Sequence, residues 1–296
     1  MALTDLSISL EKGLRSIFIE QLAKEAPLTD LIATTIQSNS DIESYGFLSE
    51  SPTPKHWPTG SERQPEALSE AKMVLANKRY ESTISVGRED LDDQAAGLAA
   101  LRPRIQELAT RASNFKSKLA VDALVANGNG IDGNPFFGAH GSQGNNLISG
   151  SGTTATACSN DLSTAIATMR KFTDGVGEPF DEEISGGLVV LCSPDMERPM
   201  QEVLDGAYVS SGGSNVMLSR AGLKVSSRLS DGDWYLACVN KPVKPLIYQD
   251  RDPIEFGALE NASETGFMKE VYHYGIRLRC NVGYGVWQRL IKVDNA

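Results

Sequence analysis

The chain has 296 residues, of which 41% are hydrophobic and 22% are charged, and its formal net charge is −10 at pH 7. This length allows one large domain or two ordinary domains with a buried core. The charge argues against tight binding of nucleic acid, which depends on lysine and arginine side chains that neutralise phosphates. No stretch approaches the roughly 20 apolar residues of a membrane helix, and the start MALTDLSISLEKG lacks the pattern of a secretory signal. We therefore expect a protein that is made and assembled in the cytoplasm, away from membranes.

The first part of the sequence predicts a helix and then a long extended insertion. Residues 9–26 place apolar side chains on one helical face, and Pro27 follows where this helix should end. The segment SPTPKHWPTGSERQPEALSEAK has four prolines between Pro52 and Pro65, and strand-like alternation returns at RYESTISV. Two extended segments thus flank a polar tip. In an enzyme such an insertion would be a lid or a loop, whereas in an assembly it can be an arm that becomes ordered on a neighbour.

The strongest periodic pattern predicts a long helix. Steps of three and four residues place the following side chains on one stripe: Leu98, Leu101, Ile105, Leu108, Ala112, Phe115 and Leu119. We expect Pro103 in the first turn of the main section, and the helix end at Asn127 and Gly128. Our preferred interpretation is a spine helix packed on a sheet of the same subunit. A coiled-coil contact is the alternative.

The remaining sequence predicts a mixture of helices and strands. Residues 128–159 are rich in glycine and asparagine and indicate loops, and Asn160 is the expected N-cap of the next helix. LVVLCS indicates a short buried strand, MERPMQEVLDGAY another helix and SSGGSN a flexible loop. The later strand candidates are GLKVSSRL, DWYLACV, KPLIYQD and the long VYHYGIRLRCNVGYGVWQRLIKV. The fold class predicted from this pattern is α+β, in two regions.

The candidate reactive residues do not form a catalytic pattern. The acidic cluster of Glu89, Asp90, Asp92 and Asp93 beside Arg88 suggests a metal site, but helix capping explains it better. The glycines around Gly130 lack the GxxxxGK[ST] phosphate loop. Three histidines stand far apart and away from any nucleophile motif: His56, His140 and His273.

The cysteines and the last aromatic residues have ordinary structural explanations. No CxxC pair occurs, and we expect reduced, buried thiols at Cys158, Cys192, Cys238 and Cys280. Alternation of one parity indicates sheet burial rather than a nucleotide-stacking platform at Tyr272, Tyr274, Ile276, Leu278 and Cys280. We predict no catalytic residue, no cofactor and no metal.

Five segments, taken in order, resemble the major head subunits of Mu-like phages and prophages. They are DIESYGFLSESPTPKHWPTGSER, NKRYESTISVGREDLDDQ, PFFGAHG, WYLACVNKPVKPLIYQDRDP and YHYGIRLRCNVGYGVWQ. The resemblance runs from about Leu10 to Val293, and the ordered set is far more specific than any single segment. That family has the HK97-type capsid fold.

The resemblance implies a division of the chain into an arm, an extended loop and two domains. The N-terminal arm would be residues 1–41 and the extended loop 42–86. The peripheral domain would be 87–150 with 246–296, and the axial domain 151–245, with SSGGSN near the ring axis. The resulting candidate interface residues are Tyr45, Lys55, Trp57, Arg63, Ser211, Gly212 and Gly213.

The function implied is that of a major capsid protein. It would self-assemble through pentamers and hexamers into an icosahedral head in the virion. That head would enclose double-stranded DNA without sequence-specific binding. Expected partners are a scaffolding protein and a portal, with a decoration protein as a further candidate. Cross-linking through Lys55, Lys72 or Lys78 is not predicted, because no carboxylate is marked for it.

Two alternatives remain open from the sequence. An encapsulin-like nanocompartment shell would share the fold and would enclose a cargo enzyme. A metal-dependent hydrolase using Asp90, Asp92 and Asp93 represents a different class. The particle size of the purified protein, measured by electron microscopy, would separate these interpretations.

Overall fold

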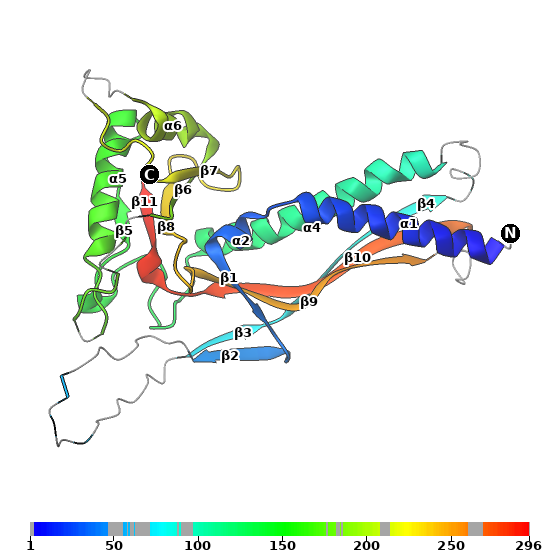
Figure 1. The fold of residues 1–296 in the computed structure, drawn as a ribbon, viewed down its shortest axis with the longest axis horizontal. Coiled ribbons are helices and arrows are strands. Elements are labelled where there is room, and N and C mark those ends of the chain that lie inside the picture. Colours follow the sequence, from blue (N-terminus) through cyan, green and yellow to red (C-terminus); the bar gives the residue numbers. More distant parts are fainter. Residues whose placement is uncertain are drawn as a thin grey trace.

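The structure is a computed structural model that describes residues 3–46, 56, 57, 59, 62, 72–87, 89, 97–175, 177–181, 184, 186–207, 214–259 and 269–295. A long arm of helices and strands extends from a unit that contains a second sheet (Figure 1). The mixture of helices and two larger sheets confirms the predicted α+β class.

A four-stranded sheet forms the arm, in the order β1–β9–β10–β4. Its strands are β1 (Ala33–Gln37), β9 (Leu246–Leu259), β10 (Val271–Tyr284) and β4 (Lys78–Gly87). β10 is antiparallel to both β9 and β4, whereas β1 is parallel to β9. The predicted burial of one parity is confirmed, because Tyr272, Tyr274, Ile276, Leu278 and Cys280 are all buried.

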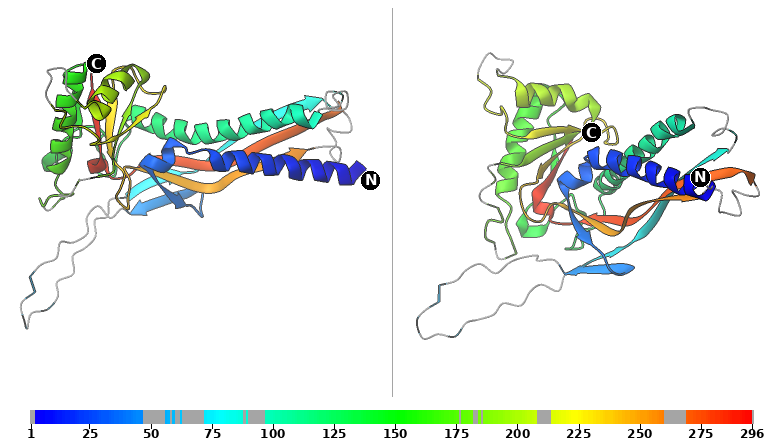
Figure 2. Two further views of the ribbon diagram at one scale, coloured as in Figure 1. Left: turned by 45° about the horizontal axis from the view of Figure 1, so that its top comes forward. Right: turned by 45° about the vertical axis from the view of Figure 1, so that its right-hand side comes forward.

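Helices α1 (Leu3–Lys24), α2 (Leu28–Ile32) and α4 (Gly97–Ala126) cover one face of this sheet (Figure 2). Phe18 of α1 is buried and stacks on Phe256 of β9 with ring centroids 5.3 Å apart. Leu101, Ile105 and Leu108 of α4 are buried in the same cluster. The predicted spine helix on a sheet of its own subunit is therefore confirmed.

The start of α4 differs from the prediction. The helix begins at Gly97, so Pro103 lies inside it rather than in a first turn. Pro103 removes one hydrogen bond near the helix start, and the buried stripe outweighs that local cost. The end is as predicted, since Asn127 takes a positive φ of 45°. Asn127 Oδ1 accepts from Phe137 N at 2.7 Å, and Asn127 Nδ2 donates to Phe137 O at 3.1 Å.

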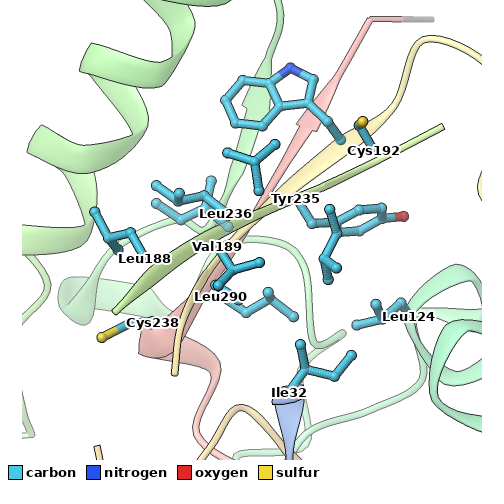
Figure 3. Packing of buried hydrophobic residues seen from close by; sticks show 14 of the residues in the cluster. Ile32, Leu124, Leu188, Val189, Cys192, Tyr235, Leu236, Cys238 and Leu290 are labelled. Carbon is cyan, nitrogen blue, oxygen red and sulfur yellow. The ribbon is translucent and has the colours of Figure 1, made fainter. Parts of the chain in front are cut away.

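A five-stranded sheet forms the second unit, in the order β5–β11–β8–β6–β7. Its strands are β5 (Leu147–Ser149), β11 (Leu290–Asp294), β8 (Trp234–Cys238), β6 (Leu188–Cys192) and β7 (Gly222–Val225). Every residue of β6 and β8 is buried. Figure 3 shows Ile32 and Leu124 from the arm beside the same core. One continuous core therefore joins the two units.

Helices α5 (Ala155–Arg170) and α6 (Glu197–Asp205) pack on the second unit, and their limits correct one prediction. The N-cap of α5 is Thr154, whose Oγ1 accepts from Ala157 N at 3.3 Å. Asn160 lies inside the helix, so its assignment as the cap was wrong. Both threonine and asparagine are favoured N-cap residues, and the TTATACSN segment offers both, so composition alone does not select the cap.

The last predicted strand, VYHYGIRLRCNVGYGVWQRLIKV, is not one continuous strand but two. The chain leaves β10 at Tyr284, forms a short 3-10 helix at Trp287–Arg289, and enters the other sheet as β11. β5 was missed within the glycine-rich stretch. Both β5 and β11 fall outside the predicted segment 151–245, although they hydrogen-bond within its sheet. The named domain division stays a prediction.

The four cysteines are buried and free, as predicted. Burial raises the pKa of Cys158 to about 11 and that of Cys192 to about 12. These thiols are therefore protonated and unreactive at neutral pH.

Candidate assembly surfaces

A two-stranded ribbon leaves the arm on the face opposite α1 and α4. Strands β2 (Ile42–Gly46) and β3 (Lys72–Ala76) pair in antiparallel register, with Glu43 opposite Leu75 (Figure 1). Leu75 is buried on the inner side, whereas Ile42 and Val74 on the outer side are each 57% exposed. The two predicted extended segments thus form a ribbon with an apolar, solvent-facing side.

Hydrogen bonds fix both ends of the ribbon on its own subunit. Tyr45 Oη donates to Gln249 Oε1 at 2.9 Å, which links β2 to β9. Asn77 Nδ2 donates to Ser38 Oγ at 2.9 Å and to Ser40 O at 2.8 Å. The ribbon therefore starts in a defined direction from its own subunit.

The turn before β2 is held by Glu43 and Arg279. Glu43 Oε1 accepts from Asn39 N at 2.8 Å and from Ser40 N at 2.9 Å, and these bonds lower the pKa of Glu43. Arg279 of β10 forms an ion pair with Asp41. The turn is thus tied to the sheet at a second point.

A glycine lets the ribbon approach the sheet closely. A Cβ atom at Gly283 would lie 3.1 Å from Leu75 Cδ2 and 3.2 Å from Met73 Sδ. Such contacts are tighter than ordinary packing, so a side chain here would push the ribbon away. Gly283 is therefore the position on β10 against which the ribbon packs most closely.

The predicted interface residues have different placements. Tyr45 is half-buried and hydrogen-bonded within its own chain, and burial raises its pKa. Trp57, in the insertion between β2 and β3, is 57% exposed. Lys55, Arg63, Ser211, Gly212 and Gly213 lie outside the described residues. The structure thus puts Tyr45 near the end of the ribbon that leads into the insertion, where its hydroxyl ties β2 to β9. Its sequence position gave no means to predict this contact.

A second exposed apolar feature follows α6. Asn215 is buried, and its Nδ2 donates to Val203 O at 2.6 Å and to Gly206 O at 2.7 Å, which satisfies carbonyls at the end of the helix. The residues beside it point to solvent, with Val216 78% exposed and Leu218 46% exposed. Sequence reasoning missed this feature, although an asparagine before apolar residues at the end of a polar loop was a usable signal.

A cleft of about 670 Å³ lies where the arm meets the second unit. It is lined by Pro27 between α1 and α2, by Asp30 of α2, by Ser117 of α4, by Lys224 of β7 and by Arg228 just after β7. Its lining mixes both charges with small polar groups. Nothing in this lining resembles a set of catalytic groups.

The histidines do not combine into one site. The buried ring of His140 lies with Nδ1 2.5 Å from Asp132 Oδ2 and stacks on Trp287 at 3.8 Å. His273 Nδ1 lies 2.8 Å from Ser85 Oγ on the strand pair β10–β4. A serine triad needs serine, histidine and carboxylate together. Here the His–Asp pair and the Ser–His pair belong to different parts of the molecule, and His56 is exposed elsewhere.

Within the described residues, no three histidine, cysteine, aspartate or glutamate side chains gather as metal ligands would. Asp90, Asp92 and Asp93 lie outside those residues, and Glu89 is exposed. None of the described helices has both the length and the apolar composition needed to span a membrane.

Comparison with known proteins gives a family match over most of the chain. Residues 8–162 and 224–296 match the family model of the Mu-like prophage major head subunit gpT. The Mu-like prophage FluMu major head subunit of Haemophilus influenzae is 24% identical over 96% of this chain and 71% of its own length. The major capsid protein of Escherichia phage Mu is 23% identical over 88% of this chain and 65% of its own length.

Solved structures share the fold. The procapsid of bacteriophage JBD30 gives a TM-score of 0.60 at 22% identity, covering 100% of this chain and 77% of that chain. The capsid of cyanophage P-SCSP1u gives 0.59 at 12% identity, covering 92% and 89%. A virus-like particle from Pyrococcus furiosus gives 0.58 at 11% identity, covering 96% and 98%. These similarities confirm the predicted HK97-type capsid fold.

Proposed function

Because this chain belongs to the family of Mu-like prophage major head subunits, we propose that identical copies of it close a phage head through rings of five and rings of six. Members of the family are structural capsid proteins, and this chain is a major capsid protein of an icosahedral head. The family match includes most of α1, the ribbon strands, all of α4 and β5 and the first half of α5, and it resumes within β7.

The observation that carries the proposal is the ribbon that is fixed at both ends and apolar on its outer side. A subunit that enters two kinds of ring needs a rigid body together with surfaces that adapt to different neighbours. The buried five-stranded sheet supplies the rigid body, while Ile42 and Val74 present apolar surface that the described part of the subunit does not cover. Covering that surface on a neighbour would stabilise the assembly.

We propose a different contact for each group of candidate interface residues. We assign Trp57, with Lys55 and Arg63, to contacts of the extended loop with the next subunit. Tryptophan and arginine are among the residue types that most often dominate the binding energy of an interface. Ser211, Gly212 and Gly213, which precede exposed Val216 in the sequence, are assigned to contacts around the ring axis. Tyr45 would hold the ribbon on β9 and act on the interface only indirectly.

The four structural parts retain their proposed bounds. Residues 1–41 are the N-terminal arm, which is only part of the long arm seen in Figure 1, and residues 42–86 are the extended loop. The peripheral domain is 87–150 with 246–296, and the axial domain is 151–245. The sheet pairing of β5 and β11 means that the axial unit would include strands from the peripheral segments.

The proposed head encloses double-stranded DNA without reading its sequence. A subunit with a net charge of −10 suits a container that does not hold its contents tightly. The proposed partners are a scaffolding protein, a portal and a decoration protein, with assembly in the cytoplasm of the host bacterium. The subunit would carry out no enzymatic reaction.

A nanocompartment shell is the second candidate, and the cleft at the end of α1 is the observation in its favour. Its lining by Pro27, Leu28, Lys224 and Arg228 would suit an extended peptide from a cargo protein. The virus-like particle from Pyrococcus furiosus shares the fold but only 11% of its residues. The family match favours the phage head.

Electron microscopy and content analysis of particles test both candidates. In cells that produce the phage, the chain should form closed shells, and these should contain double-stranded DNA that is protected from nuclease. Particles that hold one protein cargo and no DNA would support the nanocompartment. A strictly monomeric, compact species at high concentration, even with assembly partners present, would contradict both.

A further inference from the structure

Strand β7 forms one edge of the five-stranded sheet. It is the outermost strand in the sheet order and pairs with β6 in parallel register. Just after β7, Ser226 N donates to Cys192 O at 2.9 Å, so the backbone of Ser226 faces β6. Because the backbone groups of successive strand residues point to alternate sides, those of Leu223 and Val225 point away from the sheet. β7 therefore presents N–H and C=O groups with which a further strand can pair.

The cleft of about 670 Å³ borders this edge. Val225, Ser226 and Ser227 line it on the side of the second unit, and residues of α2 and α4 line it on the other side. Figure 1 shows β7 on the side of the second unit that faces the helices of the arm. A strand that pairs with β7 would lie about 4.8 Å from it, on the side of the cleft. The cleft thus has room for an extended chain beside a strand edge.

The cleft carries basic charge in a chain that is acidic as a whole. Between Asp205 and Asp231 the sequence contains no acidic residue, but it contains Arg220, Lys224 and Arg228. Lys224 and Arg228 are exposed and line the cleft. Neither of them forms an ion pair with another described residue. With a net charge of −10 elsewhere to repel it, an acidic segment would be attracted to this place.

Protection of the edge does not explain these features together. A lysine on an edge strand often prevents unwanted pairing, and Lys224 alone would fit that role. Arg228, however, lies beyond the strand and faces the same cleft, and Val225 leaves an apolar side chain 40% exposed at the edge. The described lining sets only the carboxylate of Asp30 against the two cations. The combination favours a site for an extended chain with acidic side chains.

We infer that this cleft binds an extended, acidic segment of the scaffolding protein, which adds a strand to the edge of β7. The inference rests on the proposed function, because the scaffolding protein is a partner proposed there. Main-chain hydrogen bonds with Leu223 and Val225 would supply affinity that does not depend on sequence. Lys224 and Arg228 would select acidic side chains.

Two labelled peptides test the charge of the site on dispersed, full-length subunits. One alternates valine with glutamate and the other alternates valine with lysine, because valine favours extended structure. In fluorescence anisotropy, we expect the glutamate peptide to bind at least about tenfold more tightly. Lys224→Glu should remove this preference, whereas Arg198→Glu on α6, where the native side chain is 89% exposed outside the cleft, should retain it. Equal affinity of the two peptides for the unmodified subunit would overturn the inference.

Val225→Pro tests strand pairing separately from charge. Proline removes the N–H of Val225, which points away from β6, so the subunit should keep its thermal midpoint. The affinity for the glutamate peptide should fall about tenfold or more. Lys224→Pro is the matched control, because it removes an N–H that faces β6 and should lower the thermal midpoint instead. Unchanged peptide affinity in a folded Val225→Pro subunit would contradict the added strand.

Hydrogen exchange provides a measurement that needs no variant. The amides of Leu223 and Val225 should exchange more slowly when the glutamate peptide is bound, whereas the amide of Lys224, which faces β6, should change little. Amides of Leu223 and Val225 that stay unprotected in the complex would overturn the inference. Protection of both amides in particles formed without any other protein would also overturn it, because a second copy of the chain would then cover the edge.

These tests fail independently of the proposed function. If the unmodified chain forms no particles with its assembly partners while the glutamate peptide still pairs with β7, the proposed function fails. If the chain forms heads that contain DNA, but the subunit shows no preference for the glutamate peptide, only the inference about the cleft fails.

Discussion

The two larger sheets of this subunit differ in how many of their faces are buried. β6 and β8 are buried over their whole length, between helices on one side and the end of the arm on the other. β9 begins in the same way, with Leu246 to Asp250 buried, and then alternates between buried and exposed positions. Two-sided burial produces an unbroken apolar run, whereas one-sided burial leaves every second residue to solvent.

This difference indicates where stability and assembly each reside. Replacing buried side chains of the five-stranded sheet by alanine should lower the free energy of unfolding of the isolated subunit. Changes on the open face of the four-stranded sheet and on the ribbon should alter assembly with little effect on that free energy. The three predictions below test this separation, from the largest expected change in stability to the smallest.

Trp234→Ala in β8 should produce the largest loss. Trp234 is fully buried, and truncation of a buried aromatic residue costs about 3 to 5 kcal/mol. Leu259→Ala on the open face should change the unfolding free energy by less than about 0.5 kcal/mol. Urea denaturation of dispersed subunits measures both values. Similar losses from the two variants would break the proposed separation.

Trp234→Phe is the matched control for the first prediction. The indole Nε1 of Trp234 is buried with no hydrogen-bond partner, so replacing the indole by a phenyl ring removes a group that contributes no bond. The loss should be well below that of Trp234→Ala. A loss as large as that of alanine would show that shape, rather than buried apolar volume, governs this position.

Asp132, in the loop between α4 and β5, should make the free energy of unfolding decrease at acidic pH. Burial raises the pKa of Asp132, but hydrogen bonds from His140 and Asn134 lower it more, so the pKa is lower in the folded state than in the unfolded chain. The stabilisation is therefore complete above the unfolded value of about 4 and is lost as pH falls through the folded value. Asp132→Asn should cost about 1 kcal/mol at pH 7.

The pH dependence of unfolding provides the measurement. The difference in unfolding free energy between the original chain and Asp132→Asn should shrink as the pH falls below about 4. Asp231→Asn, at an exposed carboxyl, should leave the curve unchanged. A difference that grows as the pH falls would contradict the assigned direction of the pKa shift.

The smallest effect on stability is expected at the tip of the insertion. Replacing Ser51 to Glu70 by a short Gly/Ser turn should leave the melting temperature of the subunit nearly unchanged, because the length of a surface loop contributes little. Trp57→Ala should behave in the same way, since Trp57 is 57% exposed. Particle yield, measured by electron microscopy, should fall in both variants. Normal shells together with reduced subunit stability would place the indole within its own chain.

Local patterns in the sequence predicted the elements whose signals are contained within one segment. The stripe from Leu101 to Ala112 and the apolar run of β6 needed no knowledge of distant residues. The alternation of β10 predicted correctly which side chains are buried. In each case the period of burial follows from the geometry of one helix or one strand.

Pairing between distant segments could not be predicted in this way. β5 has three residues in a glycine-rich stretch, and its parallel partner β11 lies more than 140 residues away. The break after Tyr284 is marked in the sequence only by Gly285 and by the polar residues Gln288 and Arg289, which do not reveal that the chain crosses to another sheet. The close packing at Gly283 and the contact of Tyr45 with Gln249 depend on how the ribbon folds back, which no local pattern contains.

The place of β11 within its sheet has a consequence for synthesis. β11 is hydrogen-bonded between β5 and β8, and β10 lies between β9 and β4, so the latest strands of this sequence occupy interior positions in both sheets. Ribosomes add about 5 to 20 residues per second, and domains complete their folding as units. A polypeptide interrupted before residue 271 lacks both strands and cannot complete either sheet. Interrupted translation products would therefore be excluded from the growing shell without any separate proofreading step.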